Sequence, residues 1–390
     1  MLSALALFML GAWIGCSAHN AYQQHRAIAA CNGHLQCFES LTLTIATTKG
    51  LDAGFAFVKT LYDAVPTFRP LCGPLATRIA DDFYAANVAI PDSALTPNIA
   101  TCNFGFLQEY PLALLLGGER VTRAASFCAS VGARLNDLVP GAEAECWRGM
   151  GRGLPFIDKA LWGDPYAMAK LGVSQCKTLA TNTSNYEICL SGVFYNIGRQ
   201  EVNRNYKLSV NTQDPMKLCK EQRDSATMDR CFGNYKLVAV SLVDKSDIAS
   251  AVERLYSIYG KEGSSYVQSA VWLFGYEHAA YGLLDKPLDE NAISLCMNLS
   301  PQQRQWCIDG MSVGLAKNGR PGMQGTQVLS LCARVFKSIP DFPTDYCPSR
   351  QAVGYIRGFY APAQFERFCA SMKQRLGFAC KEEPVAGYGY

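Results

Sequence analysis

The sequence has few of the residues that predict a metal site or a nucleic-acid surface. Histidine occurs only four times in 390 residues, and no two cysteines are spaced as Cys-x-x-Cys. Zinc sites need closely spaced thiolate or imidazole ligands, so no metal is expected. Charged residues make up only 18% of the chain and the net charge is +3, whereas nucleic-acid-binding proteins carry a strong, clustered basic excess. We therefore expect no nucleic-acid partner.

No motif in the sequence predicts a cofactor. The glycine-rich stretch at residues 149–153 (GMGRG) follows no predicted strand. A phosphate-binding loop requires such a strand before it. We therefore expect no cofactor.

Cysteine, in contrast, is abundant. The chain has 17 cysteines, of which Cys16 lies in the apolar N-terminus and the other sixteen are spread over the rest. Reduced cysteines buried as small hydrophobic residues are one interpretation, but the regular spacing favours a disulfide framework. Disulfides form in oxidising compartments. The chain is therefore expected to be exported to the periplasm, the cell surface or the extracellular space.

The N-terminus agrees with export. Residues 2–18 (LSALALFMLGAWIGCSA) are apolar and uncharged, and we expect residues 1–18 to be a signal peptide that is cleaved after Ala18. Because the run is at the lower edge of the length that spans a bilayer, a retained membrane anchor is an alternative, and a lipid on Cys16 is a third. Contact with a membrane is expected only through residues 2–18.

A repeated pattern covers most of the remaining chain. Residues 31–50 and 296–319 each contain two cysteines, an apolar helix and a final glycine, and residues 54–72 match residues 329–347 as an apolar helix, a proline turn and a cysteine. The cysteine that opens the second predicted helix serves as the reference residue of each copy, with Trp272 in a copy that lacks it. The reference residues are Cys37, Cys72, Cys102, Cys146, Cys189, Cys231, Trp272, Cys307, Cys347 and Cys380. Their period of about 40 residues predicts an array of helical repeats.

Each copy is expected to be a helical hairpin. A glycine follows three residues after the reference in five copies, at Gly105, Gly149, Gly192, Gly275 and Gly310. A hairpin brings the end of its first helix beside the start of its second, within disulfide distance. The expected pairs are Cys31–Cys37, Cys128–Cys146, Cys176–Cys189, Cys219–Cys231, Cys296–Cys307, Cys332–Cys347 and Cys369–Cys380, and Cys72–Cys102 completes eight.

The fold class that follows is all-α. We expect a right-handed solenoid or superhelix of disulfide-bonded hairpins over residues 19–380. Residues 381–390 have no helical pattern and are expected to be a flexible tail. Residues 85–101 are expected to be a longer loop with a short helix.

Several charged residues on the second helices are candidates for binding. Arg148 and Arg152, with Arg199 and Arg204, would form a basic strip for an acidic partner. Glu109, Glu277 and Asp309 are also expected on second helices, where solvated helix ends are the simplest interpretation. Glu277 and His278 are neighbours early on a helix, so their side chains diverge and do not act on one atom.

The disulfide-bonded helical hairpin resembles the cysteine-rich Sel1-like repeat proteins secreted by some bacteria, which are relatives of the tetratricopeptide arrays. The resemblance is one of architecture and covers most of residues 31–380. It implies protein binding or scaffolding at the cell surface, and it carries no binding residue over to this chain.

These features predict an exported, non-catalytic binding or scaffold protein whose partner is a protein or a glycan. One alternative is an enzyme in which the hairpins close into an α/α toroid and Glu109, Glu277 or Asp309 acts as acid or base on a glycan. A second alternative is a structural surface component that associates with itself.

Overall fold

The computed structural model describes residues 26–380, except 27, 32–33, 66–67, 69–70, 87–89, 103, 140, 246, 284–287, 289, 320–322, 360–361 and 378. This part of the chain is helical, and its one bridge between extended residues joins Tyr346 to Ser349. The expected all-α class is therefore confirmed. The expected signal peptide or anchor at residues 1–18 and the expected tail at residues 381–390 lie outside the described residues. None of the helices described is long and apolar enough to cross a membrane.

The chain divides into two compact units, Met1–Phe106 and Leu107–Tyr390, where the sequence predicts a single repeat domain over residues 19–380. The helices of the first unit are α2 (Leu35–Lys49), α3 (Leu51–Ala64) and α4 (Cys72–Ala85). Gly50 separates α2 from α3 with a φ of 95°, a backbone conformation that glycine adopts without strain. Short 3₁₀ turns at Asp92–Ala94 and Pro97–Ala100 occupy the expected loop.

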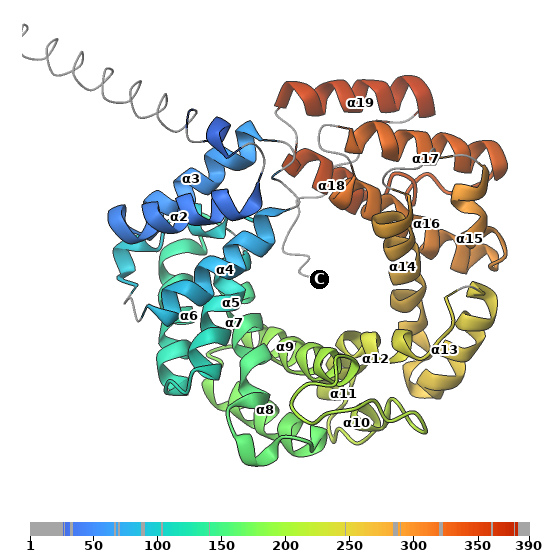
Figure 1. Ribbon diagram of the computed structural model, residues 1–390. Helices are drawn as coiled ribbons and strands as arrows, with labels where there is room; N and C mark the ends of the chain where they lie inside the picture. Colours follow the sequence, from blue (N-terminus) through green and yellow to red (C-terminus); the bar gives the residue numbers. More distant parts are fainter. Residues whose placement is uncertain are drawn as a thin grey trace, which may run out of the picture. The chain divides into compact units, whose positions relative to one another are not determined.

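The second unit contains the longer series of helices (Figure 1). In chain order they are α5 (Gly105–Leu116, which starts in the first unit), α6 (Val121–Leu135), α7 (Ala142–Gly153), α8 (Pro165–Leu179), α9 (Thr183–Val202), α10 (Lys217–Lys220), α11 (Ser225–Asn234), α12 (Lys236–Ser241), α13 (Ile248–Gly263), α14 (Val267–Glu277), α15 (Ser294–Met297), α16 (Pro301–Asn318), α17 (Gln324–Ser338), α18 (Arg350–Phe359) and α19 (Pro362–Leu376). Side chains cap several of their first turns. Asp164 accepts two backbone N–H groups of α8, and Asn182 and Asp224 cap α9 and α11 in the same way, which satisfies donors that a helix start leaves free.

Eight disulfides join neighbouring segments, and they are the eight pairs expected from the spacing. Their Cα–Cα distances lie between 5.0 and 5.8 Å. Cys128–Cys146 joins α6 to α7, and Cys176–Cys189 joins α8 to α9. All sixteen of these cysteines bond to a partner no more than 30 residues away. Each disulfide therefore stabilises one hairpin or its turn and does not link distant parts of the chain.

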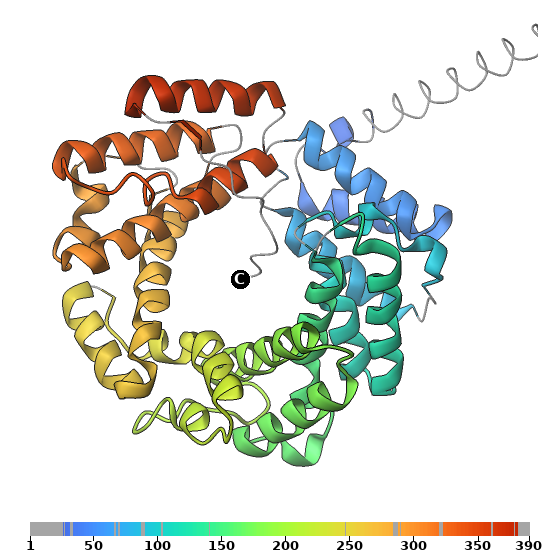
Figure 2. The same cartoon turned by 180° about the vertical axis from the view of Figure 1, so that it is seen from behind.

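Glycines let helices of the second unit touch at the backbone. A Cβ added at Gly151 of α7 would lie 1.9 Å from the carbonyl oxygen of Cys189, and one added at Gly192 of α9 would lie 2.2 Å from that of Arg148. Asn185 of α9 bonds to Glu143 near the start of α7, and Asn196 bonds to Arg152 near its end. The two helices are therefore parallel, and Figures 1 and 2 show them side by side. Gly310 of α16 packs equally closely, because a Cβ added there would lie 1.9 Å from the carbonyl oxygen of Trp272.

Cys72 begins α4 as expected, but the other reference residues do not open the second helices. Cys146 is the fifth residue of α7, and Cys189 and Cys307 are the seventh residues of α9 and α16. Cys102 and Cys347 precede a helix instead of lying in it. The start of α9, for example, follows the capping residue Asn182, whereas Cys189 lies where it can reach Cys176 of α8. These two requirements are met at different positions.

Polar contacts between neighbouring helices recur at a separation of about one repeat. Asn185 Nδ2 donates to Glu143 Oε1 over 2.7 Å with a separation of 42 residues, and Asn318 Nδ2 donates to the hydroxyl of Tyr276 with the same separation. Arg230 forms an ion pair with Glu187, 43 residues away. Such contacts are typical of repeat arrays, where each copy binds its neighbour.

The glycine contacts predict that adding one methyl group lowers the stability at Gly310 but not at Gly233. Gly310→Ala is expected to lower the free energy of unfolding by about 2 kcal/mol or more, because overpacking forces two backbones apart. Gly233→Ala is the matched control, since its Cβ would lie 3.6 Å from Tyr266, an ordinary contact. In α11 this change is expected to be neutral or slightly stabilising. Urea unfolding of the oxidised proteins measures both, and equal stability of the two variants would contradict the role given to Gly310.

Candidate functional site

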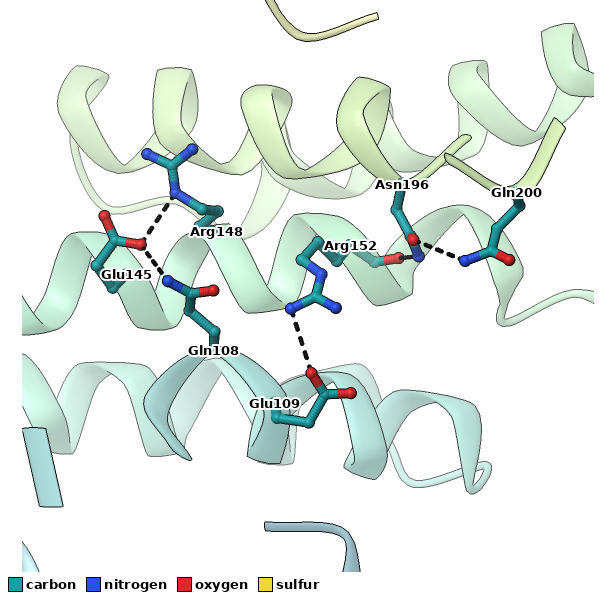
Figure 3. Close-up of polar contacts among 7 residues, drawn as sticks. All are labelled: Gln108, Glu109, Glu145, Arg148, Arg152, Asn196 and Gln200. Atoms are coloured by element: carbon teal, nitrogen blue, oxygen red, sulfur yellow. Dashed lines mark hydrogen bonds and ion pairs between the residues drawn. The ribbon is translucent and has the colours of Figure 1, made fainter. Parts of the chain in front are cut away.

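A row of polar side chains crosses α5, α7 and α9 (Figure 3). It consists of Gln108, Glu109, Glu145, Arg148, Arg152, Asn196 and Gln200, and is called the polar row below. The glycine contacts explain its position. Gly149 of α7 lies against the backbone of Gln108, and Gly192 of α9 lies against that of Arg148. The side chains next to these contacts are thereby brought within bonding distance of one another.

Glu145 is the most buried member of the polar row. Its side chain is 2% exposed, and its Oε2 accepts hydrogen bonds from Gln108 Nε2 at 2.8 Å and from Arg148 Nε at 3.0 Å. Burial raises the pKa of Glu145, while the positive charge of Arg148 and the hydrogen bonds oppose that rise. Arg148 is itself 15% exposed, so this end of the row reaches solvent through a guanidinium.

A second ion pair lies one turn further along α7. Arg152 Nη1 is 3.2 Å from Glu109 Oε2, and the two side chains are 11% and 15% exposed. Arg152 Nε is buried and has no hydrogen-bond acceptor among the described residues. The two charges of a largely buried ion pair attract each other more strongly than those of an exposed pair. Removing one member is destabilising because the other charge then stays buried without a partner. Both expected binding residues of α7 are therefore fixed by carboxylates.

Amide side chains continue the row along α9. Asn196 Nδ2 donates to the backbone oxygen of Arg152 at 2.7 Å, and Gln200 Nε2 donates to Asn196 Oδ1 at 2.9 Å. Asn205, just beyond the helix, donates to Gln200 Oε1 at 2.8 Å. This chain of hydrogen bonds connects the end of α7 to the loop that follows α9.

Next to the row, α9 buries a further carboxyl group. Glu201 is 3% exposed and accepts a hydrogen bond from the hydroxyl of Tyr235. Burial raises the pKa of Glu201 to about 7, and the hydrogen bond from Tyr235 limits the rise. The carboxyl group of Glu201 therefore gains or loses its proton near neutral pH.

Glu277 and His278 lie at the end of a helix and not early in one, so that part of the prediction is wrong. Glu277 is the last residue of α14 and forms an ion pair with Lys245. His278 begins a five-residue π-helical turn, and its Nε2 lies 3.3 Å from the backbone oxygen of Ala292. The two neighbours therefore have separate partners.

Asp309 does not lie at a solvated helix end, which corrects the simplest interpretation. It is the ninth residue of α16, and one carboxyl oxygen, Oδ1, is buried without a hydrogen-bond partner among the described residues. Burial raises its pKa to about 6, opposed by side-chain hydrogen bonds from Ser349 and Trp272. Glu109, Glu277 and Asp309 have different partners, and no contact among the described residues brings them together.

The expected basic strip is divided in two. Arg148 and Arg152 are neutralised by Glu145 and Glu109. Arg199 and Arg204 are exposed and form no ion pair with a described residue. In the described part of the chain, no group of three or more His, Cys, Asp or Glu side chains is arranged to hold a metal ion.

Sequence reasoning missed Gln108, Glu145, Asn196 and Gln200. A usable signal existed for Glu145, because it directly precedes Cys146 and lies among the buried residues of α7. A carboxylate among buried positions requires a partner. The identity of that partner depends on which helix face meets the neighbouring helix, and the sequence alone does not specify it.

Glu201 predicts a pH dependence of stability. Its pKa rises from 4.5 to about 7 on folding, so the folded state favours the protonated form. The resulting stabilisation is complete below pH 4.5 and is lost as the pH rises through 7, by about 3 kcal/mol in total. Glu201→Gln, which imitates the protonated carboxyl, is expected to remove this loss when urea unfolding is compared at pH 5 and pH 8. Glu187→Gln is the control, and it is expected to retain the pH dependence of the unchanged protein.

Comparisons of the chain with protein-family models, with curated proteins and with solved structures find no match. The resemblance to Sel1-like repeats therefore stays a prediction, and no relative supplies a functional residue. Any function must be argued from the geometry of this chain.

Proposed function

We propose that the chain is an exported, non-catalytic binding or scaffold protein whose hairpins continue as a solenoid. The polar row is its working surface, and the partner is a protein or a glycan outside the cytoplasm. The observation that carries this proposal is the pair of ion pairs on α7. Arg148 and Arg152 are held in place by Glu145 and Glu109 and are still partly exposed.

The position of these arginines on α7 supports a binding role. At about 100° per residue, Arg148 and Arg152 lie roughly opposite Cys146 on the helix. Cys146 is bonded to α6, so the arginines point away from the helix that completes their own hairpin. A guanidinium that is already fixed by a carboxylate loses little conformational freedom when it donates its remaining N–H groups to a ligand.

Export is proposed on two grounds. Eight disulfides are typical of an oxidising compartment, and the apolar residues 2–18 are typical of a signal peptide. We propose cleavage after Ala18, with a retained anchor or a lipid on Cys16 as alternatives. The experiments below also test the two alternative functions, a glycan-active enzyme and a structural surface component. A toroidal glycan-active enzyme requires Glu109, Glu277 or Asp309 to share a substrate, and a structural surface component requires self-association.

The proposal predicts that removing the arginines weakens binding without unfolding the protein. The oxidised chain would be immobilised and incubated with the exported fraction of its host. Arg148→Gln combined with Arg152→Gln is expected to reduce capture of the partner at least tenfold, the effect of losing about 1.4 kcal/mol of binding free energy. Arg123→Gln is the matched control, because Arg123, on the adjacent helix α6, forms an exposed ion pair with Glu119.

A second variant separates binding from stability. Glu109→Gln with Arg152→Gln removes both charges of one pair, and so leaves no unpaired buried charge. Loss of capture in this variant, with unchanged thermal unfolding, would support the proposal. Undiminished capture in both double variants would contradict it, and turnover of a glycan that is lost in Asp309→Asn would favour the enzyme.

Export has its own expected outcome. Non-reducing peptide mapping of protein from its native host is expected to recover Cys128–Cys146 and the other near-neighbour pairs, with a mature chain that begins near residue 19. Free thiols together with a retained Met1 would contradict export.

A further inference from the structure

Two loops lie at the same end of the parallel helices α7 and α9. After α7 the chain forms 3₁₀ turns at Leu154–Phe156 and Lys159–Leu161, and after α9 it forms the loop of residues 203–208. Tyr206 joins the loops, because its ring centroid lies 4.6 Å from that of Phe156 and 4.9 Å from that of Trp162. Trp162 and Tyr206 are each only partly buried, so this aromatic contact reaches the surface.

The second loop has an unusual backbone. Arg204, Tyr206 and Lys207 have φ values of 57°, 53° and 59°, in the left-handed region that residues with a Cβ rarely adopt. The hydrogen bond from Asn205 to Gln200 and the packing of Tyr206 hold this conformation. Local strain of this kind persists only where the surroundings enforce it, and it clusters at ligand-binding segments.

Lysines flank the aromatic contact. Lys159 Nζ lies 5.9 Å from the centre of the Trp162 ring, and Lys207 lies beside Gly163 of the first loop. Both lysines are exposed, and neither forms an ion pair with a described residue. The nearby acidic side chains are already engaged, since Asp158 accepts the N–H of Ala160 and Asp164 caps α8. These carboxylates keep their charge, but across residues 154–164 and 203–208 the three basic side chains Lys159, Arg204 and Lys207 outnumber the two acidic ones, so the loops carry a net charge of +1.

We propose that Lys159, Trp162, Tyr206 and Lys207, called the aromatic–lysine patch, bind an anionic oligosaccharide. The partly exposed rings of Trp162 and Tyr206 offer an apolar surface for a sugar ring, and the lysines supply the charge that pairs with its carboxylate or sulfate groups. The patch consists of four side chains, far fewer than the roughly 20–30 residues that each side of a stable protein interface contributes. Its size suits a short glycan segment better than a folded protein.

This inference rests on the proposed function only in taking the chain to be an exported binder, because the patch lies beyond the polar row. The row contributes two ion pairs whose charges cancel, whereas the loops of the patch carry a net positive charge. The amide chain of Asn196, Gln200 and Asn205 ties the patch to α9, so the loop that holds Tyr206 is supported by the helix.

The test is calorimetric titration of the oxidised full chain with three hexasaccharides. An alginate hexamer supplies carboxylates, a heparin hexamer adds sulfates, and cellohexaose is uncharged. We expect one or both charged hexamers to bind and the neutral one not to bind. Lys159→Glu with Lys207→Glu is expected to lower that affinity at least tenfold. The difference between the alginate and heparin affinities identifies whether carboxylate or sulfate is recognised.

The control is Lys261→Glu, which reverses an exposed charge on α13 and is expected to leave the affinity unchanged. Binding of the charged hexamer is also expected to change the tryptophan fluorescence of the unchanged protein. Trp162→Phe is expected to abolish this change while preserving the fold, as checked by circular dichroism. Equal losses in the Lys261 variant and the double variant would overturn the proposal, as would equal affinity for cellohexaose.

Binding to anionic lipid vesicles but to none of the hexamers would also overturn it and would identify a membrane surface instead. The two proposals fail separately. If the hexamers do not bind while the arginine variants still lose partner capture, the patch is wrong and the proposed function stands. If the hexamers bind and capture does not depend on Arg148 and Arg152, the polar row is wrong and the patch stands.

Discussion

The contact between a glycine and a neighbouring helix backbone is the constraint on which the second unit depends. At Gly151, Gly275 and Gly310 a methyl group would lie 1.9 Å from a carbonyl oxygen of the next helix. Helices that approach this closely leave no room for side chains at the contact. The side chains must therefore turn to either side of it. On α7, Cys146 turns to one side and bonds to α6, while Arg148 and Arg152 turn to the other. The same contact thus sets the position of both the disulfide and the polar row.

The disulfides and the glycines act over different ranges. Each disulfide joins residues at most 30 apart and stabilises one hairpin, mainly by restricting the unfolded chain. The glycine contacts and the polar contacts at a separation of about one repeat join each hairpin to the next. In the repeat array that we propose for this chain, stability would be the sum of these local and neighbour terms. Export to an oxidising compartment would therefore stabilise every hairpin separately, and the assembly of hairpins would still depend on glycine.

The sequence predicts the local part of this structure well. Helical hairpins and eight disulfides follow from spacing because the paired residues are close in the chain. It predicts the contacts between hairpins poorly, because these depend on helix rotation and crossing. Glu145 meets Gln108, and Asp309 is buried beside Trp272 and Ser349, although nothing in their immediate neighbourhood indicates it. For the same reason the repeat register is wrong for Glu277. It places this residue early on a helix, whereas Glu277 is the last residue of α14.

Charge that is balanced and charge that is free have different consequences for recognition. In the polar row the guanidinium of Arg152 faces the carboxylate of Glu109, so the row offers directed hydrogen bonds and little long-range field. The loops after α7 and α9 carry lysines without such partners, and their field attracts anions from a distance. An anionic ligand would therefore meet the loops first. Whether it also reaches the arginines of the row depends on its length, because Asn196, Gln200 and Asn205 lie between those arginines and the loops.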